Sequence, residues 1–191
     1  MKKGFTLIEL LIVLALISIL AGILIVVIKP QEIFVRARDS QRKGNLASVA
    51  RAIDTYVADL SQSGSAINWC PGNTISWSYT GTYPPASWPG VPAGYTATGT
   101  NSTAVNGTGW VRYITFASSS LVNLSTLPLD PLNQTVGGVG YFYAFVCTSN
   151  IGEYELNAKL EKDTASMQND GGNQNTGPTL LYEVGSNLNL Y

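Results

Sequence analysis

The chain has 191 residues, with 11 Lys and Arg against 12 Asp and Glu, and it contains no histidine. Without histidine, Ser-His and Cys-His nucleophile pairs cannot be built, so we expect no enzyme. The charged fraction of 12% is about half that of a typical soluble domain, whereas 45% of the residues are hydrophobic. Either the core is very large, or some apolar residues serve something other than a soluble core.

The apolar excess lies at the amino terminus. Residues 5–28 are apolar except for Thr6, Glu9, Ser18 and Gly22. As a helix, the uncharged part of this run would span about 28 Å, the thickness of a bilayer's hydrocarbon core. The run is about twice as long as the apolar core of an ordinary secretory signal, and no small-residue cleavage site follows it. This pattern predicts a membrane-spanning helix.

Glu9 is the energetically unfavourable residue in this run, because an ionisable side chain in lipid needs a partner that offsets its desolvation. One interpretation is a helix-end acid near the lipid headgroups, which the helix dipole would favour. The other is a functional acid that pairs with a cation in an apolar setting, where a misplaced subunit would leave a charge unpaired.

Residues 3–13, Lys-Gly-Phe-Thr-Leu-Ile-Glu-Leu-Leu-Ile-Val, resemble the class III signal of type IV pilins and pseudopilins. The resemblance implies that a prepilin peptidase cleaves after Gly4 and methylates the new amine of Phe5. It also implies that Glu9 pairs with a cationic amine of this kind, from its own chain or a neighbour. This pair would fix the register of one subunit against the next during assembly.

The resemblance extends to the pilin stalk and to two short anchors in the head. Residues 37–43 and 52–56 are similar to the stalk helix of the family. Residues 81–84 resemble the turn after that helix, and 127–131 resemble the loop before its hairpin. The implied fold is a long amino-terminal helix packed on a carboxy-terminal sheet.

The implied function is a structural prepilin of a type IV pilus or pilus-like filament, assembled by helix bundling. Its implied partners are further copies of the chain or related subunits, the prepilin peptidase, an inner-membrane assembly platform and, before assembly, membrane lipid. Its implied location is the cytoplasmic membrane, crossed once with the head outside, and then an extracellular pilus or periplasmic pseudopilus. No cofactor is expected.

Two other functions remain as alternatives. One is a pseudopilin of a type II secretion or competence system. The other, from a different class, is a membrane-anchored binding protein that keeps residues 1–4. Nucleic acid is not expected as a direct ligand, because residues 29–51 carry a net charge of +4 and residues 52–191 a net charge of −6. That split suits a basic stalk beside a membrane or partner chain and an acidic head.

A second helical segment follows the apolar run. Pro30 predicts a kink or break between Ala21 and Pro30. Apolar residues at spacings of three and four from Leu46 to Leu60 predict a helix with one buried face. The expected organisation is a leader at 1–4, a membrane or filament-core helix at 5–28, an amphipathic stalk at 29–63 and a head at 64–191.

Residues 64–109 hold most of the prolines and many aromatic side chains. Disorder is one interpretation, but the aromatic content favours an ordered irregular loop lying on the helix, with 96–109 mobile. Cys70 and Cys147 form no CxxC or zinc pattern, so they are either one disulfide or two free thiols. We expect the disulfide.

Strands are expected at 110–116, 141–148, 153–160 and 180–184, with a turn at 149–152. Residues 153–160 alternate in polarity, which predicts one face on the helix and one in water. The fold class is therefore α+β, with an antiparallel sheet packed on the second half of the long helix. The side chains expected in water are Glu153, Glu155, Asn157 and Lys159.

Asp163 and Asp170, with Asn169 and Asn173, form an oxygen-rich segment of the kind that can hold calcium. Its spacing does not match an EF-hand, and a solvated turn is the simpler interpretation.

Other polar patterns are weaker indications of function. Glu153, Glu155 and Glu161 would lie on or near a solvated face, so paired acid-base catalysis is not expected. Four Asn-x-Ser/Thr tripeptides are interpreted as surface loops, with glycosylation left open; they begin at Asn101, Asn106, Asn123 and Asn133.

Overall fold

The computed structural model describes residues 4–64, 66–81, 85–174 and 176–191. The chain divides into two compact units, the first ending at Ala37 and the second running from Arg38 to Tyr191. Each unit is described by itself below.

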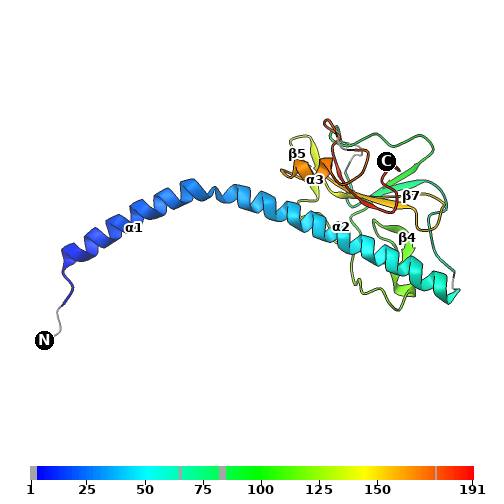
Figure 1. Ribbon diagram of the computed structural model, residues 1–191, viewed down its shortest axis with the longest axis horizontal. Coiled ribbons are helices and arrows are strands. Elements are labelled where there is room, and N and C mark those ends of the chain that lie inside the picture. The colour runs from blue at the N-terminus through cyan, green and yellow to red at the C-terminus, as the bar shows by residue number, and fades with distance from the viewer. Residues whose placement is uncertain (1–3, 65, 82–84, 175) are drawn as a thin grey trace. The chain divides into compact units, whose positions relative to one another are not determined.

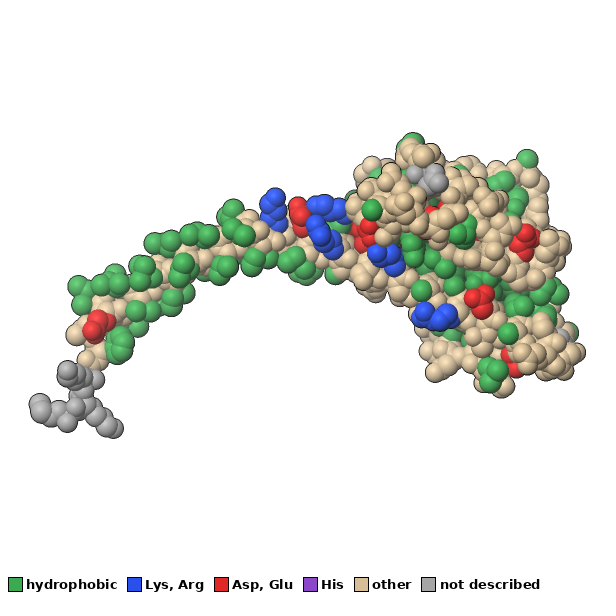
Figure 2. Space-filling view, viewed as in Figure 1, with side chains coloured by type: hydrophobic (Ala, Val, Ile, Leu, Met, Phe, Trp, Pro, Cys, Tyr) green, Lys and Arg blue, Asp and Glu red, His purple; other side chains and the backbone are tan. Residues whose placement is uncertain are grey.

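The first unit holds helix α1, Leu7–Ile28, and the first residues of helix α2, Pro30–Ser63. None of the α1 side chains is buried, and hydrophobic side chains cover the face of α1 seen in Figure 2. The expected break is confirmed at Lys29, which has φ +45°. Pro30 opens α2, where its missing N–H costs nothing, so the proline starts a new helix and does not kink an existing one.

In the second unit α2 lies along the sheet, as Figure 1 shows. The predicted apolar stripe is confirmed, because the helix buries the residues at three and four spacing that the sequence indicated, and it ends at Ser63. The hydroxyl of Tyr154 in the sheet donates to the carbonyl of Ala50, 3.2 Å away, and to Asp54 Oδ1, 2.8 Å away. The buried helix residues are Asp39, Arg42, Leu46, Val49, Ala50, Ala52, Ile53, Tyr56 and Leu60.

The main sheet has the strand order β2-β1-β7-β8-β9. All neighbouring pairs are antiparallel except β1 and β2, which are parallel, so the expected all-antiparallel sheet needs this correction. The strands are β1 Thr74–Trp77, β2 Thr96–Gly99, β7 Tyr143–Cys147, β8 Tyr154–Ala158 and β9 Tyr182–Gly185.

The strands expected near 141–148, 153–160 and 180–184 are confirmed, as is the turn between β7 and β8. The segment 64–109 is expected to be an ordered irregular loop on the helix. It holds strands and buried aromatic side chains, so the expected order is confirmed, but the expectation of a loop alone is wrong. It supplies β1, which pairs with β7 inside the sheet, and β2 at its edge. The part expected to be mobile, 96–109, contains β2 and β3.

The sheet is covered on both faces. The helix face carries one apolar cluster, which includes Tyr143, Phe145 and Leu156. The opposite face carries a second cluster, built from Ile75, Trp77, Trp88, Phe142, Ala144, Val146, Leu181 and Tyr191. The prediction of a solvated face on β8 is therefore wrong for Glu155 and Asn157, which are fully buried, because segments distant in sequence cover them.

Two small ribbons complete the second unit. The strand expected at 110–116 exists as β4, Arg112–Thr115, but it pairs with β3, Asn106–Thr108, outside the main sheet. Strands β5, Gln134–Val136, and β6, Val139–Tyr141, form a hairpin whose two turn glycines have φ of +58° and +82°. The single turn Phe116–Ser118 and the short helix α3, Thr164–Gln168, are the other elements.

Candidate processing and assembly site

The proposed processing residues lie at the exposed start of the first unit. Gly4, Phe5 and Thr6 precede α1, and 82% of the Phe5 surface is exposed. A Cβ added at Gly4 would meet no atom of this chain within 4 Å. The fold of this chain therefore does not require glycine at position 4.

Thr6 caps α1 and holds Glu9 in a reciprocal capping box. The backbone N–H and the hydroxyl of Thr6 donate to Glu9 Oε2, at 2.9 and 2.7 Å, while the Glu9 N–H donates to Thr6 Oγ1 at 3.3 Å. The carboxylate therefore folds back toward the amino terminus, next to the residue that cleavage would make the first. Sequence reasoning missed the role of Thr6, although Thr-x-x-Glu before an apolar run is the signature of this cap.

A second set of charged side chains joins α2 to the rest of the second unit. Arg42 is fully buried and binds three acids. Its Nε and Nη2 donate to the two oxygens of Asp130, at 2.6 and 3.0 Å. Its Nη1 donates to Asp39 at 2.9 Å and to Glu161 at 2.6 Å, and Arg38 binds Glu161 with a fork of its own.

These contacts set the charge states of the cluster. Burial opposes the charge of Arg42, but hydrogen bonds and Coulombic attraction from Asp130 and Glu161 raise the pKa of its guanidinium. Burial likewise acts to raise the pKa of Glu161, and hydrogen bonds from Arg38 and Arg42 lower it below its usual value. Arg42 and Glu161 are thus held in their charged forms.

The cluster corrects one expectation about the basic stalk. Arg38, Arg42 and Lys43 bind acids of their own chain; Lys43 Nζ lies 2.6 Å from Asp163 Oδ2. The idea that the basic charge of 29–51 faces a membrane or a partner chain is therefore wrong for these three. For the other basic residues of that segment, Lys29, Arg36 and Arg51, it stays a prediction.

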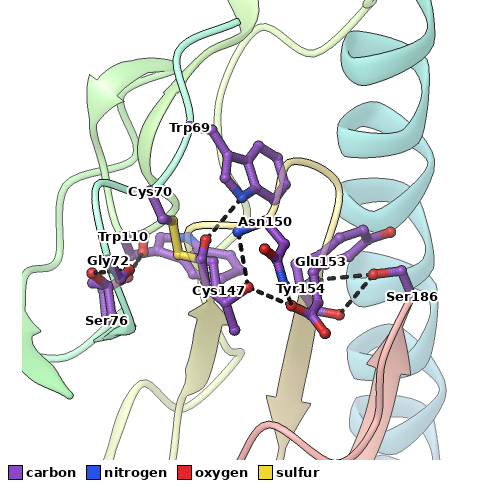
Figure 3. Close-up of a disulfide and its surroundings, with 12 residues drawn as sticks. Trp69, Cys70, Gly72, Ser76, Trp110, Cys147, Asn150, Glu153, Tyr154 and Ser186 are labelled. Atoms are coloured by element: carbon purple, nitrogen blue, oxygen red, sulfur yellow. Dashed lines mark hydrogen bonds between the residues drawn. A yellow bond between two sulfur atoms is a disulfide. The ribbon is translucent and has the colours of Figure 1, made fainter. Parts of the chain in front are cut away.

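Cys70 and Cys147 are joined by a disulfide in the structure, with their Cα atoms 6.2 Å apart. Figure 3 shows Trp69 beside this bridge, with its indole Nε1 donating to the carbonyl of Thr148 at 3.0 Å. Trp69 also meets the ring of Tyr154 edge to face. The bridge ties the segment after α2 to the end of β7.

The two calcium candidates are occupied by protein groups and do not form a common site. Asp163 accepts from Lys43 and Ser166, and Asp170 accepts from the backbone N–H groups of Gly172 and Glu183. Among the residues that the structure describes, no group of three or more acidic, cysteine or histidine side chains could hold a metal ion. We assign neither aspartate as a metal ligand.

Of the two short head segments that resemble the family, the structure describes one completely and the other only in part. Residues 127–131 lie directly before the β5–β6 hairpin, and Asp130 among them is the partner of Arg42. The turn expected at 81–84 falls largely outside the described residues, which omit 82–84.

Comparison with known proteins matches the amino terminus to the prokaryotic N-terminal methylation motif, over residues 1–25. The type IV major fimbrial protein FimA of Dichelobacter nodosus is 38% identical over 81 residues, which are 42% of this chain and 51% of that protein. The chain resembles the type IV pilin family over these segments. Its match spans about half the length of this curated relative. No solved structure matches the chain.

The matched motif covers the start of α1. The methylation motif contains Gly4, Phe5, Thr6 and Glu9, the residues at the start of α1. Helix α1 is also long and apolar enough to cross a membrane, and it is the one such helix in the described residues. An amino terminus that matches the methylation motif thus coincides with a helix that fits membrane anchoring. Neither match separates a pilin from a pseudopilin.

Proposed function

We propose that this chain is a prepilin, the structural subunit of a type IV pilus, which is cleaved after Gly4, methylated at Phe5 and assembled by bundling of α1. The supporting observation is that α1 carries the methylation motif at its start and an apolar surface with no buried residue along its whole length. A helix in lipid gains little hydrophobic free energy from meeting another apolar helix, so order in the filament must come from packing and polar pairs.

Glu9 supplies that polar pair. Before cleavage the Thr6 donors satisfy its carboxylate within the chain. Cleavage creates an ammonium at Phe5, one residue from Thr6, which is a stronger, charged partner for the acid. The carboxylate then exchanges the cap for the amine of its own chain or of a neighbouring subunit. In this mechanism the capping box supplies hydrogen bonds to the Glu9 carboxylate in lipid until a cationic amine is available.

The proposed life cycle has two stages. The prepilin first crosses the cytoplasmic membrane once through α1, with its head outside, and meets the prepilin peptidase and an inner-membrane assembly platform. The processed subunit then enters an extracellular filament of its own kind. The periplasmic pseudopilus of a secretion or competence system is the alternative destination. No catalytic role is proposed.

One mass spectrum of the amino-terminal peptide from the native host tests the core of this proposal. We expect a mature chain that begins at methylated Phe5. A chain that retains residues 1–4 would contradict the proposal and favour a permanently anchored binding protein.

Variants at positions 6 and 9 test the pairing mechanism and separate charge from capping. Glu9→Gln keeps a side chain that completes the capping box but removes the charge, whereas Thr6→Ala removes the cap and keeps the charge. We expect Glu9→Gln to be inserted and processed but to yield few or no filaments, and Thr6→Ala to assemble. Electron microscopy of sheared filaments and immunoblots of membrane-retained subunits measure both.

The opposite pattern would show that Glu9 acts as a helix cap. In that case Glu9→Gln would assemble normally, while Glu9→Ala and Thr6→Ala would fail together. Normal processing of each variant, checked by the same amino-terminal mass spectrum, is the control for membrane insertion.

A further inference from the structure

Two acidic side chains lie buried beside each other in the head without a basic partner. Glu155 on β8 is 0% exposed, and Glu183 on β9 is 1% exposed. Their strands are neighbours, with Glu155 opposite Gly185 and Asn157 opposite Glu183. None of the ion pairs among the described residues includes either acid. Two buried carboxylates with no cation are strongly unfavourable if both are ionised.

The hydrogen-bond donors around this pair satisfy only part of it. The backbone N–H of Leu190 donates to Glu155 Oε2 at 2.8 Å, and the N–H of Gln174 lies 3.3 Å from both oxygens of Glu183. The second oxygen of Glu155, Oε1, is buried, and none of the described residues donates a hydrogen bond to it. A proton on Glu183 supplies one, through a hydrogen bond between the two side chains.

The carboxy-terminal segment, residues 186–191, closes over this pair. Besides the Leu190 contact, the side chain of Gln174 donates to the carbonyl of Tyr191 at 2.8 Å. The hydroxyl of Tyr191 donates to the carbonyl of Pro89 at 2.7 Å, and its ring lies in the second apolar cluster beside Trp88. The same segment thus excludes water from the acids and donates a hydrogen bond to one of them.

We propose that Glu155 and Glu183 share one proton, and that this proton latches residues 186–191 over the sheet at acidic and neutral pH. Loss of the proton in alkaline medium places two charges in an apolar site. The segment then opens, so that water reaches both carboxylates and part of the second apolar cluster is exposed. The latch lies wholly within the head and does not depend on the filament to which the chain belongs.

The groups around the pair also favour its protonated form in the closed state. Among the described residues, the other titratable groups that interact with it are Asp170, with Glu183, and Tyr95, with Glu155, and both become negative when they ionise. Burial raises the pKa of Glu155, and burial together with the charge of Glu155 raises the pKa of Glu183 to about 8. In the open state both acids regain pKa values near 4.5. The closed state therefore holds one more proton than the open state between these limits.

The difference in bound protons between the closed and open states determines how steeply the open population depends on pH. One extra proton in the closed state makes the open population rise about tenfold per pH unit, from near pH 5 until the pair titrates near pH 8. The test measures deuterium exchange at the Leu190 amide, in the full oxidised chain in detergent micelles, between pH 5 and 9. Rates are divided by the intrinsic exchange rate at each pH, so that only protection is compared.

We expect wild-type protection at Leu190 to fall about tenfold per pH unit from pH 5 to near pH 8 and to level off above it. The double variant Glu155→Gln with Glu183→Gln should show protection independent of pH. Glu153→Gln is the matched control: it removes the charge from the group that accepts a hydrogen bond from Asn187 of the segment, 2.7 Å in the wild type, but leaves the buried pair intact. This control should lower protection at most uniformly and keep the wild-type slope.

A second measurement on the unmodified chain decides the matter if the double variant does not fold. The carboxyl carbons of Glu155 and Glu183 are followed by ¹³C NMR as the pH rises. An apparent titration above pH 7 for the pair supports the latch. Ionisation of both carboxyls below pH 6, or wild-type protection at Leu190 that does not change with pH, overturns it.

Discussion

Replacing Arg42 with methionine should be the most damaging single change to the charged cluster. Arg42 is fully buried and makes four hydrogen bonds to Asp39, Asp130 and Glu161. Methionine fills similar space but leaves the acids without their main counter-charge. Removing one partner of a buried ion pair costs about 3–5 kcal/mol, because the remaining charge stays desolvated. That is a large share of the 5–15 kcal/mol that stabilises a typical domain.

Arg38→Met is the matched control on the same helix. Its side chain is 30% exposed and shares Glu161 with Arg42, so we expect a loss of about 1 kcal/mol or less. The double variant Arg42→Met with Asp130→Asn removes one charge of each sign and should recover part of the loss. Denaturant unfolding of the full oxidised chain in detergent, followed by tryptophan fluorescence, gives all three values.

The pH dependence adds a second check on Arg42→Met. In the variant Glu161 loses the hydrogen bond and charge of Arg42, which lower its pKa, so the penalty should shrink as the pH falls and Glu161 becomes protonated. A loss no larger than that of Arg38→Met, or a loss unchanged between pH 7 and pH 4, would refute the assignment of Arg42 as the counter-charge of this cluster.

Three further predictions concern other parts of the chain. Gly4→Val should leave an unprocessed precursor in the membrane, since a Cβ blocks the closest approach to a peptidase, and a mass spectrum starting at residue 5 would contradict this. Alkylation of the unfolded, unreduced chain should label neither Cys70 nor Cys147, and labelling of both would exclude the bridge. Hydrogen bonds from Lys43 and Ser166 lower the pKa of Asp163 to about 2. Stability from this pair should be present above pH 4 and lost toward pH 2, and Lys43→Met should remove that loss in acid unfolding curves.

Local periodicity allowed the helix and the β7–β8 hairpin to be predicted from sequence. The spacing from Leu46 to Leu60 has the period of a helix with one buried face, and residues 153–160 alternate as a strand does. Both signals need only neighbours within a few residues. The Thr6–Glu9 cap is equally local and was predictable from its spacing.

Features that depend on distant segments were not predictable in this way. Strand β1 has four residues, all buried on a sheet covered from both sides, so it lacks the alternation that marks a half-exposed strand. The burial of Glu155 depends on cover from residues 186–191. Two of the three acids that bind Arg42, Asp130 and Glu161, lie 88 and 119 residues away in the chain, and no local pattern pairs them with it.

The place of β1 in the sheet has a consequence for how the head folds. Thr74 pairs with Cys147, so the centre of the sheet joins chain segments separated by more than 70 residues. Contacts of such long range must overcome a large loop-closure entropy, and they slow folding. The Cys70–Cys147 bridge closes a loop of almost the same span. Oxidation before sheet formation would turn this distant pairing into a nearly local one, so the head should fold much faster in an oxidising compartment than in a reducing one.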